Sequence, residues 1–226
     1  MTDPQTSPLP RQSWRILGLA AVLLLTATVT AIGLISAGFF DPKPVGELTA
    51  ELPLQPQSIP AGTQSLNWLD YPLTADDFSL RLTAAYESGD LDVGYGLALG
   101  SEDAALVVAV SPLGYAAITH FEPLPSQTNS NLGELDTMIA NGPPVNAAKQ
   151  PGTPLLEWQP WPHVNTDQEP NEIWVDKRGE TITVRINREI LWTGNVSISA
   201  SQVGLWSGSS NEAGTVDFET LAIFSE

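Results

Sequence analysis

Residues 172–187 have the sequence EIWVDKRGETITVRIN, in which apolar and polar residues alternate on both sides of a glycine. Ile173 and Val175 share one face of the first run, and Trp174 lies on the other face. In 181–187, isoleucine and valine alternate with threonine, arginine and asparagine. A period of two is typical of half-buried strands. The stretch therefore predicts two strands joined by a tight turn at the glycine.

Seven other segments have the same alternating or β-branched character, and turn residues separate them. They are residues 78–84, 93–99, 104–111, 115–121, 189–193, 203–207 and 216–224. About nine short strands at regular spacing are typical of a β-sandwich or barrel. The chain of 226 residues has no cysteine, so burial alone must stabilise this domain, which we expect over residues 66–226.

The N-terminal part contains an uncharged run over residues 16–40. As a helix at about 1.5 Å per residue it is roughly 37 Å long, enough to cross a hydrocarbon core of about 30 Å. We expect a cytoplasmic tail at 1–14 and a transmembrane helix at 15–40, with the lipid bilayer as its partner.

Positive charges near this run predict its orientation. Arg11 and Arg15 precede it, whereas only Lys43 follows closely. The positive-inside rule therefore predicts a single-pass protein of the cell membrane, with a cytoplasmic N-terminus and an extracytoplasmic C-terminal domain. The alternative is a cleaved signal peptide, because Val29-Thr30-Ala31 resembles a cleavage site. Both alternatives export the domain.

Two segments lack strand periodicity. Residues 41–65 are rich in proline, which opposes helices and central strands, so we expect an extended linker with one short strand at about 47–54. Residues 122–154 form a long stretch rich in Pro, Asn, Gly and Ser. A loop of this length in a compact domain is either a functional lid or a tolerated insertion.

The charge of the exported part excludes one class of partner. Residues 41–226 carry 25 acidic and 7 basic residues, a formal charge of −18. Such a surface repels phosphate backbones, so we expect no nucleic-acid binding. The charge otherwise indicates solubility or adaptation to salt.

The order of the strand segments resembles a known fold. The matching pieces lie at residues 77–82, 95–97, 114–115, 158, 170–175, 179–187, 202–206 and 216–223. Together they resemble the laminin-G and concanavalin-A-like jelly-roll domains, in particular those related to family sixteen glycoside hydrolases and to 3-keto-disaccharide hydrolase-like domains. The resemblance implies an all-β, antiparallel jelly-roll β-sandwich behind one transmembrane helix.

The most unusual aromatic cluster comprises Trp158, Trp161 and His163, which are separated by prolines. Aromatic rings stack on the apolar faces of sugars, so these three residues are candidates for a glycan-binding platform. The alternative is that one or both indoles fill the core. Trp174, Trp192 and Trp206 lie within predicted strands, and we expect them to be buried.

Calcium is the cofactor that this fold class sometimes holds. Glu87, Asp90 and Asp92 form the best candidate cluster of hard oxygen ligands between two strands. Their spacing differs from that of a regular calcium loop, so the alternative is a solvated hairpin tip. The two histidines, His120 and His163, have no metal-ligand spacing.

The residues assign no catalytic machinery. Hydrolases of this architecture use two carboxylates across one bond. Glu134-Leu135-Asp136 begins their Glu-x-Asp-x-x-Glu pattern but lacks its second glutamate and lies in the irregular segment. We therefore expect a non-catalytic, membrane-anchored module that binds a ligand such as a carbohydrate. A glycan-processing hydrolase, or an assembly domain that contacts a cell-surface protein, are the alternatives.

Overall fold

The structure is a computed structural model that describes residues 11–36, 39, 41–101, 103–121 and 152–226. It divides into two compact units, Met1–Lys43 and Pro44–Glu226. The first contains α1 (Arg11–Ser36), which begins four residues before the predicted span of 15–40 and ends four residues before its end. Within α1, Ile16–Leu34 is long and apolar enough to cross a membrane. Its length and composition fit both a membrane anchor and a signal sequence.

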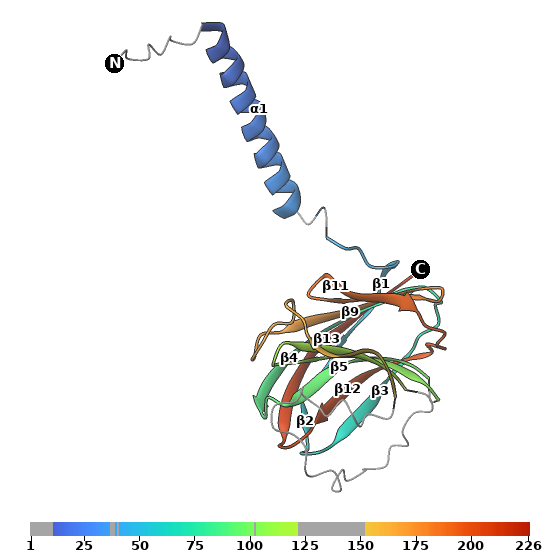
Figure 1. The fold of residues 1–226 in the computed structure, drawn as a ribbon. Coiled ribbons are helices and arrows are strands. Elements are labelled where there is room, and N and C mark those ends of the chain that lie inside the picture. The colour runs from blue at the N-terminus through green and yellow to red at the C-terminus, as the bar shows by residue number, and fades with distance from the viewer. Residues whose placement is uncertain (1–10, 37–38, 40, 102, 122–151) are drawn as a thin grey trace. The chain divides into compact units, whose positions relative to one another are not determined.

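The second unit is built from two antiparallel sheets, drawn as two layers in Figure 1. Sheet A has the strand order β1-β13-β4-β9-β10-β11, and β2 also pairs with β13. Its strands are β1 (Glu47–Pro53), β2 (Gln57–Ile59), β4 (Phe78–Gly89), β9 (Asn171–Arg178), β10 (Thr181–Ile186), β11 (Glu189–Asn195) and β13 (Gly214–Ser225). Strands from both ends of the domain therefore meet in one sheet.

Sheet B has the strand order β3-β12-β5-β6-β7-β8. Its strands are β3 (Gln64–Pro72), β5 (Val93–Gly100), β6 (Ala105–Ser111), β7 (Tyr115–Phe121), β8 (Thr153–Pro160) and β12 (Gln202–Ser209). The unit is an antiparallel jelly-roll β-sandwich, which confirms the fold class predicted from the sequence.

The hairpin at residues 172–187 forms as its alternation predicts. Val184 pairs with Val175, and Arg185 pairs with Trp174 across the two strands. The turn glycine, Gly179, has a φ of 56°, a conformation that glycine adopts without steric cost. The next hairpin turn uses Asn187 and Arg188, with φ values of 51° and 76°, although Asn-Gly is the usual sequence for such a turn.

Two segments expected to be irregular contribute strands. Within residues 41–65, β1 confirms the short strand expected near 47–54, but β2 and the start of β3 also belong to the sheets, so the segment is not only a tether. Its prolines are tolerated because β1 lies at the edge of sheet A and β2 pairs with β13 alone. The predicted loop at 122–154 lies outside the described residues except for 152–154, of which Thr153 and Pro154 begin β8.

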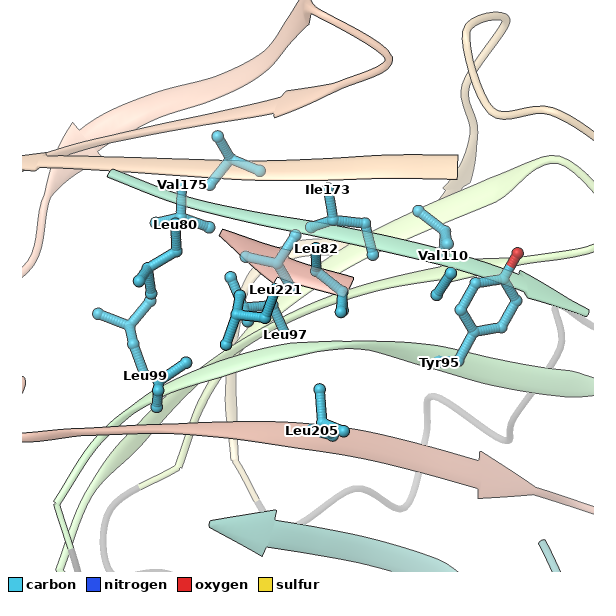
Figure 2. Packing of buried hydrophobic residues seen from close by; sticks show 14 of the residues in the cluster. Leu80, Leu82, Tyr95, Leu97, Leu99, Val110, Ile173, Val175, Leu205 and Leu221 are labelled. Carbon is cyan, nitrogen blue, oxygen red and sulfur yellow. The ribbon is translucent and has the colours of Figure 1, made fainter. Parts of the chain in front are cut away.

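The main core fills the space between the two sheets. Figure 2 shows Leu80, Leu82 and Leu221 of sheet A facing Leu97 and Leu205 of sheet B. The three sheet A leucines and Leu97 are fully buried, and Leu205 is 2% exposed. Each fully buried leucine contributes about 1.5–3 kcal/mol by leaving water. The strand pattern of the sequence thus becomes one continuous apolar layer.

Replacement of Leu82 tests this layer. Leu82→Ala leaves a cavity between the sheets and is expected to lower the free energy of unfolding by about 2–5 kcal/mol. Leu113→Ala is the matched control, because Leu113 is 44% exposed, and its change should stay within about 0.5 kcal/mol. Urea denaturation of both variants checks the prediction, and equal losses would contradict it.

Candidate functional site

Several loops gather at one end of the sandwich, which we call the loop end: residues 87–92, 112–114, 161–170, 187–188 and 210–213. Three hydrogen bonds join loops that are distant in sequence. The Asp167 amide donates to the Pro112 carbonyl (3.0 Å), the Gln168 side chain to the Glu87 carbonyl (2.6 Å), and the Asn211 side chain to Asp92 (3.1 Å). The loop end is therefore a connected surface rather than a set of separate turns.

A buried amide network fastens the 161–170 loop to the sheets. Asn171 is fully buried, and its Oδ1 accepts from the Asn165 amide (2.8 Å). Its Nδ2 donates to the Tyr95 hydroxyl (3.2 Å). Asn187 donates from Nδ2 to Asn171 Oδ1 (2.9 Å) and to the His163 carbonyl (2.7 Å). Because buried amides are costly unless satisfied, this network holds the loop in one position.

Burial raises the pKa of two tyrosines near this network. Desolvation raises the pKa of Tyr95, and the hydrogen bond with Asn171 acts in the opposite direction. Burial raises the pKa of Tyr86, and the carboxylates of Asp90 and Asp167 raise it further. Both hydroxyls therefore stay protonated at neutral pH, and the Tyr86 hydroxyl donates to the Gly89 carbonyl (2.5 Å).

Trp161 and His163 form an aromatic pair on the 161–170 loop. Their ring centroids lie 5.6 Å apart, and the rings are tilted by 53°. His163 is exposed, whereas Trp161 is half-buried and packs against the main core. The indole Nε1 of Trp161 has no hydrogen-bond partner. This nitrogen is buried, so the pair combines an accessible imidazole with a rigidly seated indole.

Trp158 does not join this pair. It is 8% exposed and packs in a second cluster with Ala98, Val107 and Trp206, on the face of sheet B that points away from the main core. Its indole lies over a glycine: a Cβ built on Gly94 would come within 3.1 Å of Trp158 Cη2 and 3.0 Å of Trp206 Cζ3. For Trp158 this packing agrees with the core alternative weighed from the sequence.

The three predicted calcium ligands lie at the loop end, where the carboxylates of Asp90 and Asp92 already accept hydrogen bonds. Asp90 Oδ1 accepts from the Asp92 amide (3.0 Å) and Asp90 Oδ2 from the Glu212 amide (3.3 Å). Across the described residues, no group of three or more His, Asp or Glu side chains is arranged to hold a metal ion. Calcium binding by Glu87, Asp90 and Asp92 therefore stays a prediction.

The other residues considered from the sequence fall elsewhere. Trp174 and Trp206 are buried as predicted, at 1% and 3% exposure, and Trp192 is half-buried. His120 lies on β7 and pairs with Thr153, away from the loop end. Glu134 and Asp136 lie outside the described residues. Sequence reasoning missed Asn165 and Asn171. Asn171 directly precedes a predicted strand, and Asn165 has no such signal.

Comparison with solved structures supports the fold. The carbohydrate-binding module CBM66 from Bacillus subtilis aligns with a TM-score of 0.51 at 10% identity, over 80% of this chain and 99% of that one. The folds are alike. Two others are the Crh5 transglycosylase (TM-score 0.48, 12% identity, 82% and 88% covered) and the galectin LEC-6 from Caenorhabditis elegans (0.41, 10%, 76% and 94%). Their TM-scores lie below 0.5, so the fold assignment depends on the binding module.

At these identities the comparisons show the fold alone. The predicted concanavalin-A-like jelly roll is confirmed, and the relationship to laminin-G domains stays a prediction. No protein-family model and no curated relative matches the sequence.

Asp90 provides a test of the loop end. Asp90→Ala removes acceptors for two backbone amides and is expected to lower the free energy of unfolding by about 1–2 kcal/mol. Because both Asp90 oxygens already accept hydrogen bonds, we expect the same loss in EDTA and in calcium. Thermal denaturation in both buffers checks this, with Asp90→Asn as the control that retains one acceptor. A calcium-dependent difference would instead assign the carboxylates to a metal.

Proposed function

We propose that the protein is a non-catalytic saccharide-binding module, tethered to the membrane and exported from the cytoplasm, that binds its ligand at the loop end. The observation that carries this proposal is the Trp161–His163 pair, with ring centroids 5.6 Å apart. Sugars present apolar C–H faces that pack on aromatic rings and hydroxyls that need hydrogen-bond partners. The exposed His163 ring offers both kinds of contact, through its face and through its nitrogens.

The placement of the pair favours binding over a purely structural role. Trp161 is anchored because its amide donates to the Gly114 carbonyl (2.9 Å) and its ring packs on the core. His163 is held through its carbonyl, which accepts from Asn187, while its ring remains exposed. Preorganised groups lose little entropy on binding, so this arrangement suits a binding surface.

The charges of the loop end favour an uncharged ligand. The loop end has six acidic residues and one basic residue, Arg188. The acidic residues are Glu87, Asp90, Asp92, Asp167, Glu169 and Glu212. Such a surface repels uronic-acid and sulfated polymers. A neutral hexose polymer meets no such penalty, and carboxylates accept hydrogen bonds from its hydroxyls.

The fold and the N-terminal helix are consistent with this proposal. One solved structure that shares the fold is named as a carbohydrate-binding module. A common scaffold is weak support for a common function, because one fold serves many. The helix at Ile16–Leu34, as an anchor, would keep the module at the cell surface.

Substitution of the exposed histidine tests the proposal. On an array of neutral and acidic glycans, we expect the detergent-solubilised full chain to bind neutral glycans. Loss of the ring in His163→Ala should remove about 0.5–1.5 kcal/mol, which corresponds to a roughly twofold to twelvefold weakening. His163 is preferred to Trp161 because its ring is exposed and its loss should leave the core intact.

The matched control removes the other imidazole. His120 lies on β7, away from the loop end, so His120→Ala should leave binding unchanged. Equal effects of the two substitutions, or preferential binding of acidic glycans, would contradict the proposed site. Turnover of a bound glycan would instead favour a hydrolase.

A further inference from the structure

The chain enters and leaves the sandwich at the same end, where β1 begins beside the C-terminus (Figure 1). Glu47 at the start of β1 pairs with Ser225 at the end of β13, and Ser225 also pairs with Phe78 at the start of β4. We call this end the tether end, and it comprises residues 44–47, 77–78, 178–181 and 225–226. At their other ends, β13 and β4 pair through Gly214 and Gly89, which border the loop end. The tether end and the loop end are therefore opposite ends of the sandwich.

The segment that holds β1 and β2 follows β13 from one of these ends to the other. Glu47 pairs with Ser225 at the tether end, and Ile59 pairs with Gly214 beside the loop end. Between β1 and β2, the Leu54 amide continues the ladder with a hydrogen bond to a carbonyl of β13 (3.0 Å). The first part of the sandwich is thus bonded to its last strand over most of that strand's length.

The point of entry is fixed by a buried hydrogen-bond network. Val45 is 1% exposed, and its amide donates to Ser79 Oγ on β4 (2.6 Å). The Ser79 hydroxyl donates in turn to Asp176 Oδ1 on β9 (2.5 Å), which also accepts from Trp174 Nε1 (2.6 Å). Buried polar groups that are satisfied in this way rigidify their surroundings. The chain therefore leaves the sandwich at residue 44 from a fixed point.

Gly46 brings the entering chain directly against the end of β13. Its φ is 75°, a conformation that glycine adopts without steric cost. A Cβ at this position would lie 2.2 Å from the carbonyl carbon and oxygen of Ser225. The entering chain and the last strand are thus in close contact before their ladder begins.

We propose that the sandwich transmits force between its tether and a polymeric saccharide held at the loop end, and that β1 resists this force by shear against β13. The proposal rests on the proposed function, which supplies an anchor before residue 44 and a ligand at the loop end. Tension between the two then runs parallel to the strands. Because the hydrogen bonds of an antiparallel pair lie perpendicular to its strands, such a pull strains the whole β1–β13 ladder at once.

The strand order makes β1 the element that sets the resistance. At the loop end, force from the 161–170 loop enters β9 at Asn171, and β9 pairs with β4 on one side and β10 on the other. At the tether end, force enters β1, which pairs with β13 alone. One side chain strengthens this single ladder, because Thr49 Oγ1 donates to the Ile223 carbonyl (3.0 Å).

Force applied to one fold in two directions tests the proposal. The chain has no cysteine, so two introduced cysteines define where handles attach for optical tweezers. Lys43→Cys with Glu169→Cys loads β1 in shear, whereas Lys43→Cys with Glu226→Cys separates β1 from β13 one pair at a time. All three replaced side chains are exposed. For the full chain in detergent, we expect a first rupture force at least about twofold higher in the shear direction.

Equal rupture forces in the two directions, or a lower force in shear, would overturn the proposal. In the shear direction, Thr49→Val should lower the rupture force. The matched control is Thr193→Val, which removes the bond to Thr183 between β10 and β11 (3.3 Å) and should leave the force unchanged. Equal effects of the two substitutions would contradict the role of the β1–β13 ladder. Should Glu169→Cys fail to fold, Leu113→Cys replaces it, because Leu113 is 44% exposed at the loop end.

The force measurement uses no glycan, so it separates this proposal from the proposed function. Rupture that is independent of direction, in a chain that still binds glycans, would overturn the load path alone. Rupture that depends on direction, in a chain that binds no glycan, would support the shear geometry and overturn the saccharide as its load.

Discussion

The packing of two apolar sheet faces against each other is the interaction on which this structure depends. The chain has no cysteine, and residues 41–226 carry a large negative charge, so burial must offset both chain entropy and charge repulsion. The inward residues of β4 and β13 meet those of β5 and β12, and many of them have no exposed surface. Burial of this layer fixes which side chains of each strand remain on the outside.

That constraint distributes the remaining side chains over two outer faces and a loop end. Because alternate residues of a strand point in opposite directions, burial of Ile173 and Val175 places Trp174 on the outer face of sheet A. The same hairpin ends at Asn187, whose amide network holds the 161–170 loop. The core, the outward position of Trp174 and the amide network are thus consequences of one register, and a shift by one residue would lose all three.

The alternating pattern predicted the sandwich and most of its strands, because it is local and repeats in each strand, but it missed β2, β3 and β8. It failed for residues 41–65, where prolines indicated a tether but the edge of a sheet accommodates them. The aromatic triplet was only partly predictable. Trp158, Trp161 and His163 are close in sequence, yet Trp158 lies within β8 and the other two follow its end. Which face a residue occupies after a strand ends depends on tertiary contacts.

The most direct test of the central packing is native-state hydrogen exchange, measured by mass spectrometry on the full chain in detergent. If the inter-sheet layer carries the stability, the slowest amides in the domain should lie in the central strands β4, β13, β5 and β12, and they should exchange together in one global opening. The edge strands β1, β3, β8 and β11 should exchange sooner. Equal or greater protection in the edge strands, or separate opening of the two sheets, would contradict this account.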